Sequence, residues 1–250
     1  MSQYKIDAGT GQHIGDRAEQ QDRVAIFGAP NAPGYMMAVL ADGMGGRLGG
    51  ALAADQLITT AKQLFADFAP ASDTVEQLLH DIASETHTII KLAGVTSDKE
   101  PHTTMVALVL APNGVATWGH VGDSRLYRFK GPDFVEHTVD HSYVEKLIGE
   151  GKLTRDEAQS HPLASVLVNA IGSKVGDPLV SIARYTGLKA GDMFLLCSDG
   201  FWPYFTHVEM GAAIAANKPR DAAEMLIAQA RLRAVGINAD NCTFAIVKLV

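Results

Sequence analysis

The chain has 250 residues, a formal net charge of −7 and a hydrophobic fraction of 47%. This length can bury a full hydrophobic core, and the composition is that of a globular protein, not of a disordered or membrane protein. No cluster of Lys and Arg is present to neutralise a phosphate backbone, so we expect no nucleic-acid partner. The two cysteines, Cys197 and Cys242, are too few for a disulfide framework or a thiolate zinc site.

No targeting or membrane segment is recognisable in the sequence. Residues 1–7 contain no basic segment followed by an apolar stretch, so no secretory signal is visible. The longest apolar runs, such as Met105 to Ala111, are far shorter than the roughly 18 residues that a spanning helix needs. We expect a cytoplasmic protein without membrane contact. Because no repeat or long linker divides the chain, we also expect a single domain over residues 1–250.

The first third of the chain predicts strands followed by two helices. Tyr4–His13 and Val24–Phe27 have strand character, and Met36–Ala41 is a short apolar run typical of a buried strand. After a cluster of glycines, apolar residues recur at helical spacing from Leu57 to Phe68. A second helix is predicted to begin at Asp73, whose carboxylate would cap its first turn. We expect these two helices to pack together on one face.

In the middle of the chain the pattern changes to that of short strands and then to that of a polar helical insertion. Four runs separated by short turns predict an antiparallel meander: Thr103–Leu110, Val115–Val121, Ser124–Phe129 and Phe134–Val139. From about residue 140 to 175 the pattern is mostly helical and polar, with Thr154 and Glu157 at capping-box spacing. We interpret this insertion as a flap.

The last third combines strands and helices in runs. Val180–Tyr185 and Met193–Cys197 resume the strand pattern, helices are predicted at about 207–216 and 220–234, and a strand at Cys242–Val250 ends the chain. Because strands and helices come in runs and do not alternate strictly, the predicted class is α+β with antiparallel sheets. A sandwich of two antiparallel sheets covered by helices fits this order best.

Three aspartates lie where an apolar strand-like run ends or begins. Asp42 follows Met36–Ala41, Asp199 follows a run that begins at Met193, and Asp240 precedes the last strand. Strand ends can converge at one edge of a sandwich, and Mg²⁺ or Mn²⁺ binds a few carboxylates together with several waters. A single Asp-Gly pair is by itself more often a simple turn. The joint pattern is what favours a metal site.

Two further aspartates and one arginine are also candidates. Asp123 lies between two predicted strands, where a hairpin turn with a salt-bridging Arg125 is an equally good interpretation. Near the N-terminus, Arg17 comes five residues before Asp22. The planar guanidinium of arginine suits a phosphate dianion.

These segments together resemble the PPM or type 2C family of metal-dependent serine/threonine phosphatases, in its compact bacterial form. The resemblance covers essentially the whole chain, and seven segments match in order: 15–22, 41–46, 103–104, 122–125, 140–142, 196–200 and 240–241. Any one of them is weak evidence, whereas all of them in order are strong. The family fold is a pair of antiparallel sheets flanked by helices in an αββα arrangement, which agrees with the pattern-based prediction.

The resemblance implies metal ligands at five positions. Asp42 would bridge two metal ions, and the carbonyl of Gly43 would complete one shell. Asp199 and Asp240 would hold the second ion. Asp123, together with Asp199, would hold a third, weaker ion found in bacterial relatives. The implied cofactors are therefore two Mn²⁺ or Mg²⁺ ions per site, with a third in some relatives.

The resemblance also implies the chemistry. Arg17 would grip the phosphate, and Asp22 would orient a metal-bound water, so that Arg17, Asp22 and Asp42 form the catalytic set. A metal-activated water at the binuclear centre would hydrolyse the phosphoester without a covalent phosphoenzyme. The flap would lie beside the active site.

Several positions depart from the family pattern or compete for a role in it. Gln21 stands where some relatives offer a glutamate ligand, and Met44 where eukaryotic members have a histidine that serves as general acid. His120 and His141 lie beside motif residues, but a lone histidine is more often a hydrogen-bonded structural residue.

We therefore expect a monomeric phosphatase that acts on phosphoserine and phosphothreonine in proteins and opposes a bacterial Ser/Thr kinase. One alternative is a catalytically silent family member that acts as a regulatory binding module, for which a lost metal ligand would be the sign. Another is a phosphohydrolase for small phosphoesters, which the lack of a nucleotide-binding glycine loop with its Lys-Ser/Thr disfavours.

Overall fold

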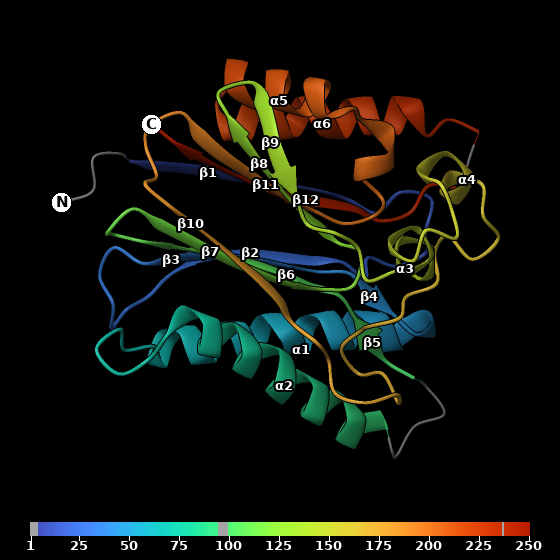
Figure 1. The fold of residues 1–250 in the computed structure, drawn as a ribbon, viewed down its shortest axis with the longest axis horizontal. Helices are drawn as coiled ribbons and strands as arrows, with labels where there is room; N and C mark the ends of the chain where they lie inside the picture. Colours follow the sequence, from blue (N-terminus) through green and yellow to red (C-terminus); the bar gives the residue numbers. More distant parts are fainter. Residues whose placement is uncertain (1–4, 95–99, 237) are drawn as a thin grey trace.

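Two five-stranded antiparallel sheets pack face to face in the computed structural model, which describes residues 5–94, 100–236 and 238–250 (Figure 1). The first sheet has the order β1 (Ile6–His13), β12 (Cys242–Leu249), β11 (Asp192–Cys197), β8 (Arg125–Lys130) and β9 (Asp133–His137). The second has the order β10 (Ser181–Thr186), β7 (Val115–Val121), β6 (Met105–Ala111), β3 (Met36–Ala41) and β2 (Arg23–Gly28). Tyr4, the first residue of the first predicted strand, lies outside the described residues.

A pair of helices covers the outer face of each sheet, as Figure 1 shows. Helices α1 (Gly46–Asp67) and α2 (Val75–Gly94) pack on the second sheet, and α5 (His207–Ala216) and α6 (Pro219–Arg233) pack on the first. A short 3₁₀ helix, Trp202–Tyr204, precedes α5. The predicted class of two antiparallel sheets flanked by helices is therefore confirmed. Within the described ranges, no helix combines the length and the apolar character that crossing a membrane requires.

The core has three layers, and this explains why the central strands are apolar throughout. In β3, Met37 and Val39 pack against the α1–α2 layer, whereas Ala38 and Leu40 pack between the two sheets. A strand that is buried on both faces has no polar side to alternate with, and its sequence is a continuous apolar run. β11 follows the same rule, with Leu195 on the α5–α6 side.

Two local predictions were wrong. The strands β7 and β8 do not form a hairpin, because β7 belongs to the second sheet and β8 to the first. The predicted meander is therefore two hairpins, joined where residues 122–124 cross from one sheet to the other. The predicted cap Asp73 instead accepts a hydrogen bond from the Ala69 amide at 2.8 Å, and Thr74 Oγ1 accepts one from the Gln77 amide at 3.2 Å.

The flap connects β9 to β10 and lies at one end of the sandwich. It contains α3 (Tyr143–Gly149) and α4 (Arg155–Gln159), and α4 begins with the predicted capping box of Thr154 and Glu157. In Figure 1 these helices lie at the same end as the short strands β4 (Gly43–Met44) and β5 (His102–Thr103), away from the labelled chain termini. The sandwich thus presents strand ends, a two-stranded ribbon and the flap at one place.

Candidate metal centre

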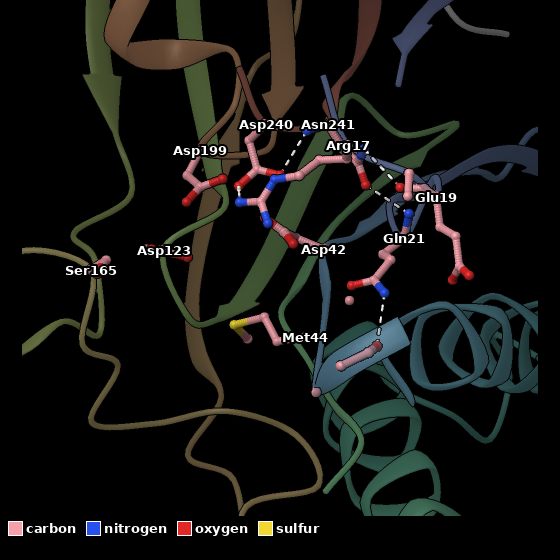
Figure 2. A pocket seen from close by; sticks show the side chains of 14 residues that line it. Arg17, Glu19, Gln21, Asp42, Met44, Asp123, Ser165, Asp199, Asp240 and Asn241 are labelled. Carbon is pink, nitrogen blue, oxygen red and sulfur yellow. Dashed lines mark hydrogen bonds and ion pairs between the residues drawn. The ribbon is translucent and has the colours of Figure 1, made fainter. Parts of the chain in front are cut away.

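The predicted metal and phosphate residues converge on a single pocket at this end of the sandwich. The pocket has a volume of about 440 Å³, and Figure 2 shows Arg17, Asp42, Asp199 and Asp240 grouped on one side of Asp123, with Ser165 of the flap on the other. Six predicted residues line it: Arg17, Asp42, Gly43, Asp123, Asp199 and Asp240. Gln21 and Met44, where the sequence departs from the family pattern, also line it.

Asp42 is positioned by its backbone, which bonds to two threonines, Thr103 at the end of β5 and Thr104 directly before β6. The Asp42 amide donates to Thr104 Oγ1 at 3.0 Å, and the Asp42 carbonyl accepts from the Thr104 amide at 2.9 Å. Thr103 Oγ1 donates to the same carbonyl at 3.1 Å. Because Thr103 and Thr104 are themselves buried, these bonds fix the point at which the chain leaves β3. The Thr-Thr segment of the sequence thereby acquires a structural role.

Gly43 must be a glycine because another backbone segment touches it. A Cβ atom on Gly43 would lie 2.1 Å from the Gly50 carbonyl oxygen and 2.7 Å from that of Gln21. Gly50 lies in the first turns of α1, which explains why this helix begins inside the glycine cluster. Residues 43 and 50 can approach so closely only without side chains. The result is a two-stranded ribbon, β4 with β5, that carries the Gly43 carbonyl next to Asp42.

Asp199 and Asp240 lie next to each other because β11 and β12 are antiparallel neighbours. The Ser198 amide donates to the Thr243 carbonyl at 2.9 Å, which continues the pairing one step beyond β11. A Cβ atom on Gly200 would lie 2.0 Å from the Asn241 carbonyl oxygen, so the Asp-Gly turn packs directly on the segment that follows Asp240. The predicted convergence of Asp199 and Asp240 therefore results from the pairing of β11 with β12.

Asp123 belongs to the crossing between the two sheets and not to a hairpin. Gly122 has φ +101°, a conformation that favours glycine, and a Cβ atom at this position would lie 2.7 Å from Thr104 Cγ2. The hydroxyls of Ser124 and Thr104 are 2.7 Å apart and hydrogen-bonded. Thr104 therefore connects the Asp123 turn to the Asp42 backbone.

The carboxylates raise each other's pKa. Burial first, and then the charges of Asp22, Asp199, Asp123 and Asp240, raise the pKa of Asp42 well above its usual value. Burial, followed by Asp199 and Asp140, raises the pKa of Asp123 to about 8. Burial and the charge of Asp240 raise the pKa of Asp199 as well. A group of acids that resists ionisation is an arrangement that bound cations would relieve.

The donor set fits a hard cation that keeps part of its water shell. No three His, Cys, Asp or Glu side chains of the described ranges come together closely enough to enclose one ion by themselves. A zinc site of four protein ligands is therefore absent from these residues, whereas Mg²⁺ and Mn²⁺ sites are built from one or two carboxylates, a carbonyl and several waters. Asp42, Gly43, Asp123, Asp199 and Asp240 offer such a set around one pocket.

Asp22 is the one candidate that does not line the pocket. It is buried, and Ser198 Oγ donates to its Oδ2 atom at 2.8 Å. Burial raises the pKa of Asp22 to about 7 despite that hydrogen bond, and the charges of Asp199 and Asp240 add to the increase. Its carboxyl is thus electrostatically part of the cluster although it is buried and does not line the pocket.

Arg17 extends over the pocket and pairs with Asp240 (Figure 2). Its side chain is half exposed, and a guanidinium has five N–H donors, so one ion pair leaves donors for phosphate oxygens. The preceding residue holds this segment in place, since Asp16 accepts from the Ala239 amide at 3.0 Å and from Arg231 at 3.1 Å.

Sequence reasoning missed several residues that support the site. Asn241 Oδ1 accepts from the Gln21 amide at 2.7 Å, and Gln21 Nε2 donates to the Gly46 carbonyl at 2.9 Å. Ser198 and Asn241 each adjoin a predicted metal ligand, a signal that could have identified them. Ser165 carried no such signal, because only the folding of the flap brings it to the pocket.

The two histidines beside the motifs do not line this pocket. His120 Nε2 donates to the Val139 carbonyl at 2.8 Å, and the rings of His120 and His141 stack with centroids 4.4 Å apart. His141 Nε2 lies 2.9 Å from Ser181 Oγ, so the ring of His141 bonds to the start of β10.

Known protein sequences with similarity to this chain are phosphatases. Residues 9–231 match the family described as Protein phosphatase 2C. The chain is 30% identical over 236 residues to the protein phosphatase PhpP of Streptococcus pneumoniae, which covers 93% of each chain. It is 31% identical over 218 residues to the serine/threonine protein phosphatase PstP of Mycobacterium tuberculosis, which covers 87% of this chain and 41% of that relative.

Solved structures share the fold. The serine/threonine phosphatase of S. agalactiae superposes with a TM-score of 0.88 at 27% identity, covering 98% of this chain and 99% of the other. The catalytic domain of PstP, solved in complex with two manganese ions, superposes with a TM-score of 0.76 at 24% identity over 98% of both chains. The two-sheet architecture with flanking helices is thus shared across the full length of the described fold.

Proposed function

The chain belongs to the protein phosphatase 2C family and is a serine/threonine protein phosphatase, and we propose that it works with a binuclear Mg²⁺ or Mn²⁺ centre in the pocket at the end of the sandwich. The observation that carries this proposal is the convergence of Asp42, Asp123, Asp199 and Asp240 on one pocket, together with the raised pKa values of the first three. The two manganese ions in the PstP complex support the same number here.

Each residue has a distinct task in the proposed centre. Asp42 would bridge the two ions and the Gly43 carbonyl would complete one shell, while Asp199 and Asp240 would bind the second ion. Asp123 with Asp199 would hold a third ion. When bound, the ions lower the pKa of water and neutralise negative charge on the phosphoryl oxygens.

Two side chains of the protein would bind the phosphate and orient the attacking water. Arg17 directs its remaining N–H groups at the phosphate oxygens, which a planar guanidinium can contact two at a time. Asp22 would orient a water at the centre, and Ser198 Oγ, which donates to its Oδ2 atom at 2.8 Å, fixes one of its oxygens.

One pair of measurements tests this function. The purified chain should hydrolyse an aryl phosphate and phosphothreonine peptides with Mn²⁺ or Mg²⁺, and a chelator should abolish both activities. Calorimetric titration of the chelated protein with Mn²⁺ should give at least two binding events per chain. Metal-independent turnover, or a titration without binding, would exclude the binuclear proposal.

Other parts of the function stay predictions. An opposing Ser/Thr kinase, a monomeric state, a cytoplasmic location and a single catalytic domain over residues 1–250 rest on the sequence alone. All predicted metal ligands are present in the pocket, which disfavours a silent binding module. No feature of the pocket favours a small phosphoester over a phosphoprotein.

A further inference from the structure

His141 occupies the place where the chain enters the flap. The preceding residue, Asp140, forms a two-bond ion pair with Arg125 of β8, with distances of 2.8 and 2.7 Å, and both side chains are largely buried. The His141 amide donates to the Gly122 carbonyl at 2.9 Å. The backbone of His141 is therefore attached to the body of the molecule beside the Asp123 turn.

The returning arm of the flap pairs with the same short segment. The Val168 amide donates to the His141 carbonyl at 2.9 Å, and the Tyr143 amide donates to the Val166 carbonyl at 2.8 Å. Ser165, which faces the pocket in Figure 2, directly precedes this pairing. The position of Ser165 over the pocket thus depends on how residues 166–168 sit against residues 141–143.

The side chain of Asn169 has one possible orientation. Its Oδ1 atom accepts from the Leu179 amide at 3.1 Å, and its Nδ2 atom donates to the Leu179 carbonyl at 2.7 Å. The amide therefore presents an N–H group, not an oxygen, to His141 Nδ1 at 2.8 Å. Since an N–H group can only donate, Nδ1 of His141 must accept.

A second donor reaches the same nitrogen from the body. The Gly122 amide lies 3.2 Å from His141 Nδ1, so this atom accepts from both the flap and the Asp123 turn. The proton of the neutral ring is consequently on Nε2, which donates to Ser181 Oγ at 2.9 Å at the start of β10. Burial first, and then the neighbouring His120, lower the pKa of His141 to about 4, so Nδ1 stays an acceptor at neutral pH.

We propose that His141 is a positioning residue for the phosphatase reaction, and that its Nδ1 atom holds the flap, through Asn169, at a fixed position relative to the Gly122–Asp123 turn. We name His141, Asn169 and Ser181 the flap anchor. The proposal rests on the proposed function for its kinetic consequence only. The flap anchor acts on the part of a substrate that extends beyond the phosphate, because it places the flap wall of the pocket and supplies no group to the phosphate itself.

A set of variants distinguishes loss of the flap anchor from general destabilisation of the fold. His141→Ala removes the acceptor for both donors, whereas Asn169→Ala removes the flap donor and leaves the Gly122 bond to His141 intact. His141→Asn is the conservative variant, since its short amide can present an oxygen near the position of Nδ1. Val175→Ala is the matched control within the same loop, because Val175 is 89% exposed, and His80→Ala on the exposed face of α2 is the histidine control.

The first measurement is amide hydrogen exchange on the intact chain, with and without Mn²⁺. We expect His141→Ala and Asn169→Ala to lose protection at Tyr143 and Val168, with His141→Asn in between and both controls like the wild type. This result does not depend on turnover, so the anchor can be judged even on a chain that hydrolyses nothing. Wild-type protection in both alanine variants would overturn the proposal.

The second measurement is the split between KM and kcat for two substrates. We expect both alanine variants to raise KM for a phosphothreonine peptide by roughly fivefold to tenfold, the effect of one or two lost hydrogen bonds. The KM for an aryl phosphate should change much less. An equal loss of kcat on both substrates with unchanged KM would contradict a positioning role. If His141→Ala does not fold, Asn169→Ala and His141→Asn still decide the question.

Discussion

The ligand-bearing end of the sandwich and the flap are held in place by different kinds of contact. The Asp42 backbone bonds on both sides to the buried Thr104, and the flanking strands are buried on both faces. The flap leaves four large apolar side chains exposed: Leu163, Val166, Val168 and Val175. Ile171 joins the core beside α1 and α2, whereas residues 163–168 contribute no buried side chain and depend on individual hydrogen bonds for their position.

This difference in attachment indicates that the two regions have different roles. The residues that would hold metal ions sit on elements that the core fixes, whereas the wall facing them across the pocket is attached through a few polar groups. We therefore expect changes at the sandwich end to alter metal binding and kcat, and changes in the flap to alter KM for extended substrates. The following predictions test that comparison.

The largest effect should come from Asp42→Asn, which removes charge from the proposed bridging ligand and keeps the shape of the side chain. We expect activity to fall by more than about 100-fold, because loss of even an outer partner of a metal site typically costs 10- to 100-fold. The folded state should survive, since a buried carboxyl with a raised pKa is being replaced by a neutral amide. Turnover assays with Mn²⁺ and circular dichroism measure the two effects, and wild-type turnover would remove Asp42 from the mechanism.

Arg17→Ala should mainly weaken substrate binding. Loss of a charge-assisted contact to phosphate costs on the order of 10- to 100-fold in kcat/KM. Steady-state kinetics should show the change in KM, and metal titration should remain close to the wild type. Arg17→Lys, which keeps the charge but not the planar fork, should recover only part of the loss. An unchanged KM combined with reduced metal content would refute this role.

The carboxylate cluster should make the metal-free protein less stable as the pH rises from about 4 to about 8. The pKa values of Asp22 and Asp123 are raised to about 7 and about 8, whereas an unfolded aspartate titrates near 3.9. The folded state then binds more protons than the unfolded state in this interval, so the free energy of unfolding falls with increasing pH. The stabilising contribution is complete below pH 4 and is lost toward pH 8.

Urea denaturation with chelator at pH 5 and at pH 8 measures this effect. From the size of the pKa shifts we expect a difference on the order of a few kcal/mol. Asp22→Asn removes one of the titrating groups and should flatten the profile, and Mn²⁺ should restore stability at pH 8. A metal-free wild type whose stability increases across this range would contradict the proposed protonation of the cluster.

Thr104→Val tests whether the sandwich end depends on the threonine pair. The substitution keeps the shape but leaves the Asp42 amide and the Ser124 hydroxyl without their partner, which typically costs about 1–3 kcal/mol of stability. Thr104→Ser retains the hydroxyl and serves as the control. Chemical denaturation and Mn²⁺ titration should both report the loss in the valine variant and not in the serine variant. Equal values for the two variants would mean that the hydroxyl is unimportant.

Ser165→Ala should have the smallest effect. Ser165 is an exposed flap residue that lines the pocket, so its hydroxyl can contribute at most one hydrogen bond to a bound peptide. We expect KM for a phosphothreonine peptide to increase by roughly twofold to fivefold, with kcat and Mn²⁺ affinity unchanged. A reduced Mn²⁺ affinity would place Ser165 with the metal-binding residues and would weaken the comparison between the two regions.

Much of the fold could be predicted because it depends on short-range patterns. Met36–Ala41 and Val115–Val121 are strands with the predicted bounds, and the capping box at Thr154 and Glu157 is present. The pairing of β7 with β8 was predicted wrongly because turn residues at Gly122 indicate a change of direction without indicating which sheet the chain joins next. Local chemistry is the same for a hairpin and for a crossing between sheets.

The sequence by itself determined the element types, the order of the motifs and the acidic residues at the strand ends, since these depend on spacing along the chain. Only the tertiary structure decided that Thr104 bonds to Asp42, that Ser198 bonds to a buried Asp22, and that Asn169 meets His141. The first two contacts join residues 62 and 176 positions apart, and such pairs come together only when the sheets pack. The aspartates that open the case for a metal site are therefore readable from the sequence, whereas their pKa values and the contacts that position them depend on burial and on neighbours that the fold supplies.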